Sequence, residues 1–459
     1  MRLPVQSPCR VALAAAVLLT ILAAPLAAQA PGPGRRHTPP PDPALVKLRE
    51  AAKADARIWE RLEALCDRIG PRIAGSAPYQ AAVRWAEAAF REDGQEGVRT
   101  EPVKVNLWVR GRERAAMTAP VQRELPMLGL GDSVGSPGIE AAVAVVRSFE
   151  ELGPQVKGKI VLFDPPAPAG ASAGALYGTF VRFRGRGASE AAGAGAVAML
   201  LRSMPPVSLA TPHTGAMRYD PAKPRIPAAA IASEYAEWIA RLAAAGIEVR
   251  VRLEMEAHEG GIVDAPNVVA EIRGSEKPEE VVVIGGHLDS WDVGQGAQDD
   301  GAGVVEVLEA LRLIRGLGAP PKRTIRAVLF ANEEHGLDGG KAYAEAHKGE
   351  QQVAAVESDL GSGKPERWGI AGTPAQLAWF LTAAQPVGLP VEVGGGGADI
   401  SPLAEQGILV AGLYPNAERY FEIHHTNADT LDKVDPTLLR EGLTAVATLA
   451  WQLANAPAP

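Results

Sequence analysis

Cysteine is scarce in this sequence, which has two, Cys9 and Cys66, among 459 residues. Cys9 precedes an apolar N-terminal run and would leave with it as part of a signal peptide. One remaining thiol cannot form an internal disulfide, so stability must come from the hydrophobic core and from bound metal. A lone cysteine is more often a small buried hydrophobe than a nucleophile, and we do not expect Cys66 to act in catalysis.

A basic segment is also missing from the chain. The formal net charge is -8, and no Lys/Arg-rich run follows the N-terminus. Nucleic acid and other polyanions are therefore not expected as partners. The apolar fraction of 47% and the charged fraction of 22% are those of an ordinary soluble globular protein, long enough for two or three domains. A neutral or small substrate fits this composition better.

The N-terminus has the features of an export signal. Arg2 and Arg10 precede an uncharged run rich in Ala, Leu and Val at residues 11–28, and residues 28–30 have the small-x-small form of a signal-peptidase site. An uncleaved membrane anchor is the alternative, but the run is short and its alanine content makes it a weak anchor. We expect residues 1–30 to be a signal peptide and the mature protein to be periplasmic or extracellular, with no stable membrane anchor. The Pro-rich residues 31–44 predict an extended linker.

The rest of the chain divides into a larger, discontinuous part, residues 45–119 and 256–459, and an insert. Between residue 45 and about residue 90 the apolar residues recur at helical spacing, with Gly70-Pro71 separating two expected helices. From residue 265 onward, continuous apolar strands alternate with helices; the clearest are strands 281–284, 324–330 and 353–356 and helix 304–311. This alternation predicts the α/β class, with a mostly parallel central sheet flanked by helices.

The pattern of apolar runs changes in residues 120–255, and it predicts a smaller, β-rich insert. Short β-like runs are separated by Pro/Gly-rich stretches and by helices built on small residues; the expected strands are 141–146, 159–163 and 247–253, and the expected helices are 189–201 and 233–244. No His/Asp/Glu cluster falls inside this region, so we interpret it as a non-catalytic insert.

A possible metal ligand follows the first of the buried strands. His287 leaves the strand end, and Asp289 can accept the second ring N–H and so fix the tautomer. Gly294 and Gly296 let the loop turn back, so that Asp299 can reach the same pocket. Taken singly, His287 could be a core histidine and Asp299 a helix N-cap. Because ligands collect at the carboxyl ends of strands in such sheets, the two together favour a metal site.

Two adjacent carboxylates, Glu333 and Glu334, follow the second strand. Like charges at the mouth of a buried strand repel each other, so the arrangement is costly unless a cation lies there. We assign Glu334 as a metal ligand and Glu333 as the general base that takes a proton from a metal-activated water and passes it to a leaving amine. A solvated helix start, favoured by the helix dipole, is the competing interpretation.

Two further motifs complete the set. Strand alternation places Glu357 and Asp359 on one side, and Asp359 is the better ligand because it lies further beyond the apolar run. His424 and His425 stand in tandem; in a strand only one could face a metal, and spacing alone does not choose between them. Imidazole nitrogen and carboxylate oxygen are ligands of Zn²⁺, so we predict a hydrolase with two zinc ions per chain.

The order of motifs resembles that of the co-catalytic zinc exopeptidases of clan MH. The motifs are His-x-Asp, Asp-Asp-Gly, Glu-Glu, Glu-Ser-Asp and His-x-x-x-Asp-Thr, and the likeness covers about residues 45 to 455. The resemblance implies that Asp299 bridges two zinc ions and that Glu333 is the base. It also implies one zinc on His287 and Asp359 and the other on Glu334 and His425, which selects His425 from the tandem pair.

The same resemblance implies a zinc exopeptidase fold in which residues 120–255 are a protease-associated domain. It implies a homodimer that hydrolyses short peptides, such as dipeptides with free termini. A broad-specificity aminopeptidase is the alternative. A catalytically dead binding protein would show substitutions in the ligand set, and none is present. Zinc deacylases of a related clan carry their insert between the Glu pair and the last His, whereas here it precedes His287. The resemblance leaves undetermined the conformation of Gly394 to Gly397, a loop on the substrate side.

Overall fold

The computed structural model describes residues 42–168, 170–204 and 209–457. The expected signal peptide and residues 31–41 of the expected linker lie outside the described residues. The first helix, α1 (Pro43–Lys53), includes the last two residues of the expected linker, and Asp42 is its N-cap. Within the described residues, none of the helices has the length and apolarity needed to cross a bilayer.

Three helices, where two were expected, lead into the main sheet. After α1 come α2 (Arg57–Arg68) and α3 (Ala77–Glu92). The expected break lies between α2 and α3, where Gly70 adopts a φ of +75° and Ser76 caps α3 by accepting the Tyr79 N–H. The additional break between α1 and α2 contains neither glycine nor proline, and the periodicity of the sequence did not reveal it.

The main sheet is mixed, with a parallel centre. Its order is β1 (Glu96–Glu101), β12 (Asn267–Ile272), β14 (Arg323–Phe330), β13 (Lys277–His287), β15 (Gln351–Ser358), β18 (Leu409–Pro415), β16 (Pro365–Ala371) and β17 (Val391–Val393). The four central strands β14, β13, β15 and β18 are parallel, while β1, β12 and β16 make antiparallel pairs. The expected α/β class with a parallel centre is confirmed, and antiparallel pairs flank the centre on both sides, with β17 parallel to β16 at one edge.

Both faces of the main sheet are buried, as continuous apolar strands predict. Val282 and Ile284 of β13 belong to a core cluster shared with α6 (Ala302–Arg315) and α12 (Pro436–Asn455). The alternate residues Val281 and Val283 belong to a second cluster with Tyr343 of α8 (Asp338–Ala346), which also includes residues of α10 (Ser401–Glu405). Helix α9 (Pro374–Ala384) adds Phe380 to the first cluster. Because β13, β14 and β15 are parallel, their carboxyl ends lie at one edge of this buried sheet.

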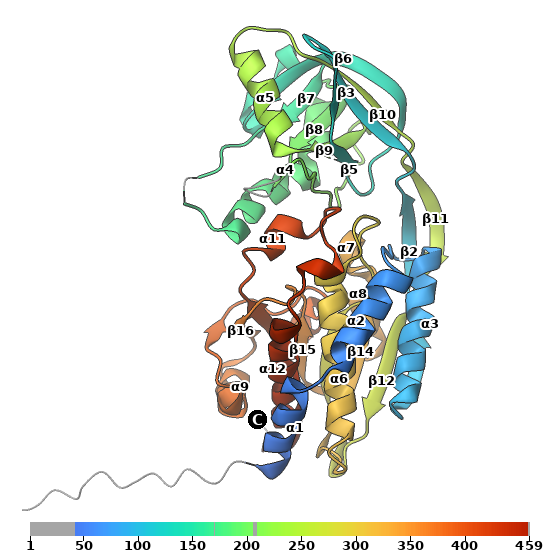
Figure 1. Cartoon of the computed structure of the whole chain (residues 1–459), viewed down its shortest axis with the longest axis vertical. Coiled ribbons are helices and arrows are strands. Elements are labelled where there is room, and N and C mark those ends of the chain that lie inside the picture. The colour runs from blue at the N-terminus through green and yellow to red at the C-terminus, as the bar shows by residue number, and fades with distance from the viewer. Residues whose placement is uncertain (1–41, 169, 205–208, 458–459) are drawn as a thin grey trace, which may run out of the picture. The chain divides into compact units, whose positions relative to one another are not determined.

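The insert forms a second sheet, reached through a two-stranded ribbon of β2 (Lys104–Val109) and β11 (His258–Asp264) (Figure 1). Its order is β4 (Arg123–Leu125), β3 (Glu113–Ala119), β10 (Arg250–Met255), β6 (Ser136–Val146), β7 (Ile160–Phe163), β8 (Ala198–Arg202), β9 (Ala228–Ile231) and β5 (Met127–Gly129). Two helices accompany it, α4 (Ala173–Gly193) and α5 (Ser233–Ala244). Strand β3 belongs to this sheet although it precedes residue 120.

One expected helix of the insert is wrong. The segment 189–201 was expected to be helical, but α4 ends at Gly193, and Ala198 to Arg202 form strand β8 between β7 and β9. Gly195, with a φ of +88°, turns the chain between them. A short apolar run has the same pattern in a buried helix and in a buried strand, so periodicity could not separate the two. The other expected helix, 233–244, coincides with α5.

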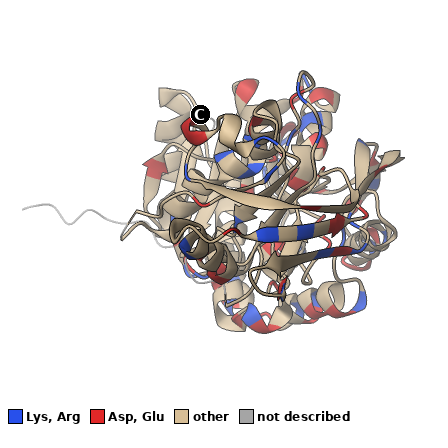
Figure 2. Ribbon diagram, turned by 90° about the horizontal axis from the view of Figure 1, so that it is seen from above, with Lys and Arg blue, Asp and Glu red and all other residues tan. Residues whose placement is uncertain are grey.

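Charged residues of both signs are interspersed over the ribbon seen from above (Figure 2). This distribution agrees with the absence of a basic run in the sequence. It gives no support for a polyanion partner.

The free thiol of Cys66 lies in the core and should not react in the folded protein. Cys66 is on α2 and is 2% exposed, and burial raises its pKa to about 12. In a Cys9→Ser background, we expect iodoacetamide to label Cys66 at least about 100-fold more slowly in native buffer than in urea, because the thiolate is the reactive form. Equal labelling rates in the two conditions would show that the thiol is accessible.

Candidate metal centre

Three of the expected ligands meet at the ends of β13 and β15. His287 is the last residue of β13, and its Nε2 lies 3.1 Å from Oδ1 of Asp299 and 3.2 Å from Oδ1 of Asp359. Asp359 directly follows β15, and Asp299 lies in the loop before α6. The parallel pairing of β13 and β15 brings the two strand ends together, as the sequence predicted.

The other two expected ligands meet on the opposite side of Asp299. Glu334 belongs to the short helix α7 (Glu333–Gly336) after β14, and His425 follows the short helix α11 (Tyr420–Ile423). Nε2 of His425 lies 3.1 Å from Oδ2 of Asp299 and 3.1 Å from Oε2 of Glu334. The two oxygens of Asp299 therefore face two different histidines. We call His287, Asp299, Glu334, Asp359 and His425 the metal cluster.

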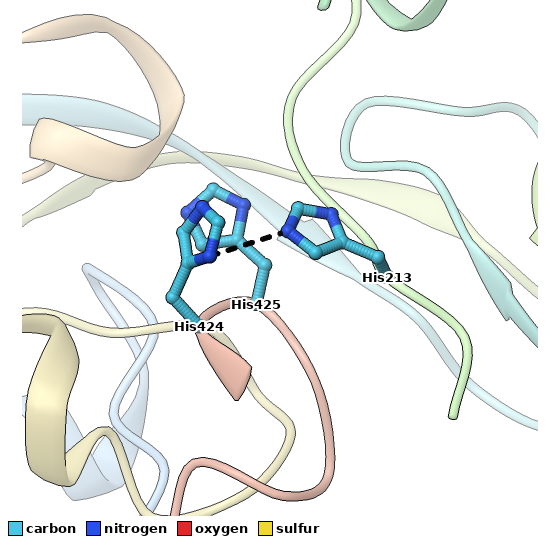
Figure 3. Close-up of side chains that lie close together, drawn as sticks. All are labelled: His213, His424 and His425. Carbon is cyan, nitrogen blue, oxygen red and sulfur yellow. Dashed lines mark hydrogen bonds between the residues drawn. The ribbon is translucent and has the colours of Figure 1, made fainter. Parts of the chain in front are cut away.

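The tandem histidines lie in a turn and not in a strand, contrary to expectation. His425 has a φ of +58°, and its ring turns toward Asp299. Nδ1 of His424 lies 3.2 Å from the Tyr420 carbonyl oxygen and 3.4 Å from Nε2 of His213 (Figure 3). The rings of His424 and His425 have centres 4.5 Å apart, but one nitrogen of His425 faces Asp299 while Nδ1 of His424 faces Tyr420 and His213.

The electrostatics of the metal cluster fit a bound cation. Burial raises the pKa values of Glu334 and Asp359, and the neighbouring Asp299 carboxylate raises both further. Oε1 of Glu334 is buried and has no hydrogen-bond partner among the described residues. Burial alone would lower the pKa values of His287 and His425, but the surrounding carboxylates raise both well above the usual value. A cation would satisfy these oxygens and replace the protons on the histidines.

Glu333 lies beside the metal cluster and lines the same cavity, but it makes none of the short contacts to the histidines. Burial, followed by the charges of Asp359 and Glu334, raises its pKa well above the usual value. Its backbone N–H donates to Oδ1 of Asp289 over 3.2 Å. Nδ1 of His287 lies 3.0 Å from the backbone carbonyl oxygen of Asp289 and 3.7 Å from its carboxylate. The Asp289 carboxylate thus holds Glu333, and its carbonyl faces the imidazole.

The loop that carries Asp299 is fixed by two residues that sequence reasoning did not single out. Asp429 accepts the backbone N–H groups of Ala297, Gln298 and Asp299 at 2.8–3.2 Å. Arg72, fully buried after α2, donates to the carbonyl oxygens of Leu288, Gln295 and Gly296 at 2.7–3.0 Å. The Asp-Thr motif at Asp429 was visible in the sequence, but nothing in the pattern indicated Arg72.

Asp300, adjacent to Asp299, is close to His287 but has another role. Its Oδ2 accepts the backbone N–H of His287 at 3.1 Å, and its Oδ1 accepts that of Gly303 at 3.0 Å. Both oxygens are thus engaged by the backbone, which ties the end of β13 to the start of α6. Asp299 is the better ligand because its two oxygens face the imidazole nitrogens of His287 and His425.

Glu357 holds the glycine-rich loop whose conformation the sequence left open. Its carboxylate accepts the backbone N–H groups of Ala398, Asp399 and Ile400 at 2.9–3.4 Å. A Cβ atom at Gly397 would lie 2.2 Å from Cδ of Glu357, so a side chain there would displace the carboxylate. Glu357 therefore positions the loop, which supports the choice of Asp359 as the ligand.

Residues of the insert line the same cavity as the metal cluster, which the sequence pattern did not indicate. The backbone N–H of Thr214 donates to the His425 carbonyl oxygen over 2.9 Å. A cavity of about 590 Å³ is lined by the metal cluster except the fully buried His287, by Glu333, and by residues of the insert. The insert residues with side chains at the cavity are Tyr177, Arg184, Arg186, Ala216, Met217 and Arg218. The contacts of Arg184 and His213 with the tandem histidines join segments more than 200 residues apart. Such contacts cannot be predicted from the local sequence pattern.

Comparisons with known proteins agree with this geometry. A model of Peptidase family M28 matches residues 267–450. Carboxypeptidase Q of Bos taurus is 39% identical over 422 residues, which cover 90% of this chain and 88% of the relative. The structure of a peptidase M28 precursor from Shewanella amazonensis has a TM-score of 0.86 at 36% identity, covering 90% of this chain and 98% of that chain. A zinc aminopeptidase from Bacillus subtilis shares the fold with a TM-score of 0.66 at 20% identity, covering 88% and 96%.

Removal of bound metal should destabilise the protein, and more so at high pH. In the metal-free protein, the raised pKa values of Glu333, Glu334 and Asp359 give stability that is present at low pH and is lost as pH rises above about 4. The raised pKa values of the two histidines act in the same direction above about pH 6.5. Thermal unfolding with and without a chelator, at about pH 5 and about pH 8, should show a gap that widens with pH. No gap after exhaustive chelation would exclude a metal from this cluster.

Proposed function

The chain belongs to peptidase family M28 and is a zinc metallopeptidase, and on this premise we propose that it is an exported exopeptidase that hydrolyses short peptides with free termini. The observation that carries the proposal is the placement of Asp299, whose two oxygens lie 3.1 Å from two histidines on opposite sides. A carboxylate in this position suits a bridge between two metal ions.

We infer that the site binds two zinc ions. His287 and Asp359 would hold one ion, Glu334 and His425 would hold the other, and Asp299 would bind both. The fit rests on the donor set of imidazole nitrogens and carboxylate oxygens, and on the buried Glu334 oxygen that has no hydrogen-bond partner among the described residues. Bound zinc supplies positive charge that activates water and polarises the scissile carbonyl group.

Glu333 is the general base in this proposal. It lines the cavity beside the metal cluster, and burial raises its pKa, which makes its carboxylate a stronger proton acceptor than that of an ordinary glutamate. Its carboxylate would take the proton of the attacking water and deliver it to the nitrogen of the leaving amine. Asp289 positions Glu333 through the backbone N–H and so contributes without contacting the substrate.

The size of the cavity supports a small substrate. Its volume of about 590 Å³ falls within the range of about 300–1,000 Å³ that is typical of small-molecule sites. We infer that the insert is a protease-associated domain that covers the metal cluster and limits the length of peptide that can enter. Export and a homodimeric state remain part of the proposal, on the strength of the N-terminal sequence and the family resemblance.

A panel of related substrates tests the proposed specificity. We expect zinc-dependent hydrolysis of free dipeptides, at least about 10-fold faster than that of the same dipeptides acetylated at the N-terminus, because a site for free termini must leave a buried polar group unpaired when one end is blocked. Release of amino acids, measured with and without chelator, gives the rates. Faster cleavage of amino-acyl chromogenic substrates than of any dipeptide would favour the broad-specificity aminopeptidase.

Replacing each of the two adjacent glutamates by glutamine, one at a time, tests their separate roles. Glu333→Gln should retain zinc and lower kcat by at least about 100-fold, because it removes the proton acceptor and leaves the ligands in place. Glu334→Gln is the matched variant and should lose zinc affinity. Zinc content by elemental analysis, together with kcat, separates the two effects. Loss of zinc in Glu333→Gln with retention in Glu334→Gln would mean that the roles are reversed.

A further inference from the structure

The charges that line the cavity are divided between its two walls. All four lining carboxylates belong to the metal cluster or to Glu333. The guanidinium groups all come from the insert: Arg184, Arg186 and Arg218. Arg186 and Arg218 are exposed at the surface, whereas Arg184 is 8% exposed. A buried guanidinium needs an anionic or a carbonyl partner, because isolated burial of a charge is costly.

Arg184 has no such partner among the described residues. Its only polar contact among the described residues is with a ring nitrogen of His425, and its Nε is buried without a hydrogen bond. Its guanidinium carbon lies 5.4 Å from the centre of the Tyr177 ring, and its Nη1 lies 3.4 Å from Nδ1 of His425. A Cβ atom at Gly215 would lie 2.1 Å from Nη1, so the absence of a side chain there makes room for the guanidinium. The surrounding residues leave room for the guanidinium of Arg184, but most of its N–H groups have no acceptor among the described residues.

The contact with His425 cannot satisfy Arg184 in the zinc-loaded protein. Arg184 can only donate, so Nδ1 of His425 must accept in this contact. When Nε2 of His425 binds zinc, a neutral imidazole carries its proton on Nδ1 and becomes a donor there as well. Two donors 3.4 Å apart form no hydrogen bond. Loading the site therefore leaves a buried guanidinium beside the reaction centre with no acceptor from the described chain.

We propose, on the basis of the exopeptidase function above, that Arg184 binds the free α-carboxylate of the peptide substrate. The planar guanidinium matches a carboxylate with two parallel hydrogen bonds. A single residue spans at most about 3.6 Å, so in a dipeptide the terminal carboxylate lies close to the scissile bond. Arg184 lies one imidazole ring from the metal-facing nitrogen of His425, which suits this short separation. The exposed Arg186 and Arg218 would draw the same anionic end toward the cavity.

This assignment makes the insert the element that recognises the carboxyl end. The metal cluster and Glu333 lie at the ends of strands and helices of the main sheet, whereas Arg184 lies on α4 of the insert. Substrates with an amidated C-terminus would lose the guanidinium contact and keep all the others. The proposal therefore predicts carboxyl-end selectivity that depends on one side chain.

The test compares a free dipeptide with the same dipeptide amidated at its C-terminus. The unmodified protein should show a kcat/KM about 100-fold higher for the free form, as expected for a charged hydrogen-bonded pair. Arg184→Gln should lower kcat/KM for the free form by about that factor and change that of the amide little, whereas Arg184→Lys should keep part of the selectivity. Arg182→Gln is the matched control, since Arg182 is exposed on the same helix and does not line the cavity.

Equal losses on the free and amidated forms in Arg184→Gln, or unchanged selectivity, would overturn the proposal. Loss of zinc from this variant would do the same, because Arg184 would then act by supporting His425. The free forms of dipeptides ending in Glu and in Ala should be affected alike. An effect confined to those ending in Glu would assign the guanidinium to the substrate side chain instead.

A binding measurement separates this proposal from the proposed function. In the zinc-loaded Glu333→Gln protein, calorimetry should show a Kd about 100-fold lower for the free dipeptide than for its amide, and Arg184→Gln in the same background should remove the difference. If the unmodified protein hydrolyses no dipeptide but this selectivity holds, the function fails and the role of Arg184 stands. If hydrolysis of dipeptides occurs without the selectivity, the proposed function stands and the role of Arg184 fails.

Discussion

The structure depends on one carboxylate that is shared between two histidines. Asp299 presents one oxygen to His287 and the other to His425, although these histidines are 138 residues apart by their numbers in the chain. Each approach buries an imidazole against an acid, and Oε1 of Glu334 beside them has no hydrogen-bond partner among the described residues. The arrangement becomes favourable when cations replace the protons, so the fold of the loop and the affinity for metal are coupled.

The rest of the chain holds that carboxylate in place. Three backbone N–H groups around Asp299 donate to Asp429, and three carbonyl groups of the same loop accept from Arg72. Asp429 comes from near the C-terminus, and Arg72 from the turn between two N-terminal helices. Because both side chains are buried, loss of either would leave buried backbone groups without a hydrogen-bond partner. The loop is thus positioned by polar contacts from both ends of the described chain.

The sequence predicted those features of the site that depend on short segments of the chain, such as the position of a residue at a strand end. His287, Glu334 and Asp359 each follow an apolar strand, and strand ends in a parallel sheet meet at one edge, so their convergence was predictable. His425 follows a short helix and lies in a turn, so alternation could not select it, and only the family resemblance did. The apolar run in 189–201 contains both a helix end and a strand, which share one pattern. The approach of the insert to the site could not be predicted, because it depends on the packing of distant segments.

That packing changes the electrostatics of the site. With two zinc ions bound, their four positive charges would roughly balance the metal cluster carboxylates and Glu333, and the catalytic wall would be close to neutral. The three arginines of the insert would then dominate the field in the cavity, and a low-dielectric interior strengthens their effect. A dipeptide carries one charge of each sign, so such a field orients it with its carboxylate toward the insert and its amine away from it. The direction in which the substrate binds would therefore be set by the insert, while the bond to be broken is selected by the metals at the ends of the main sheet.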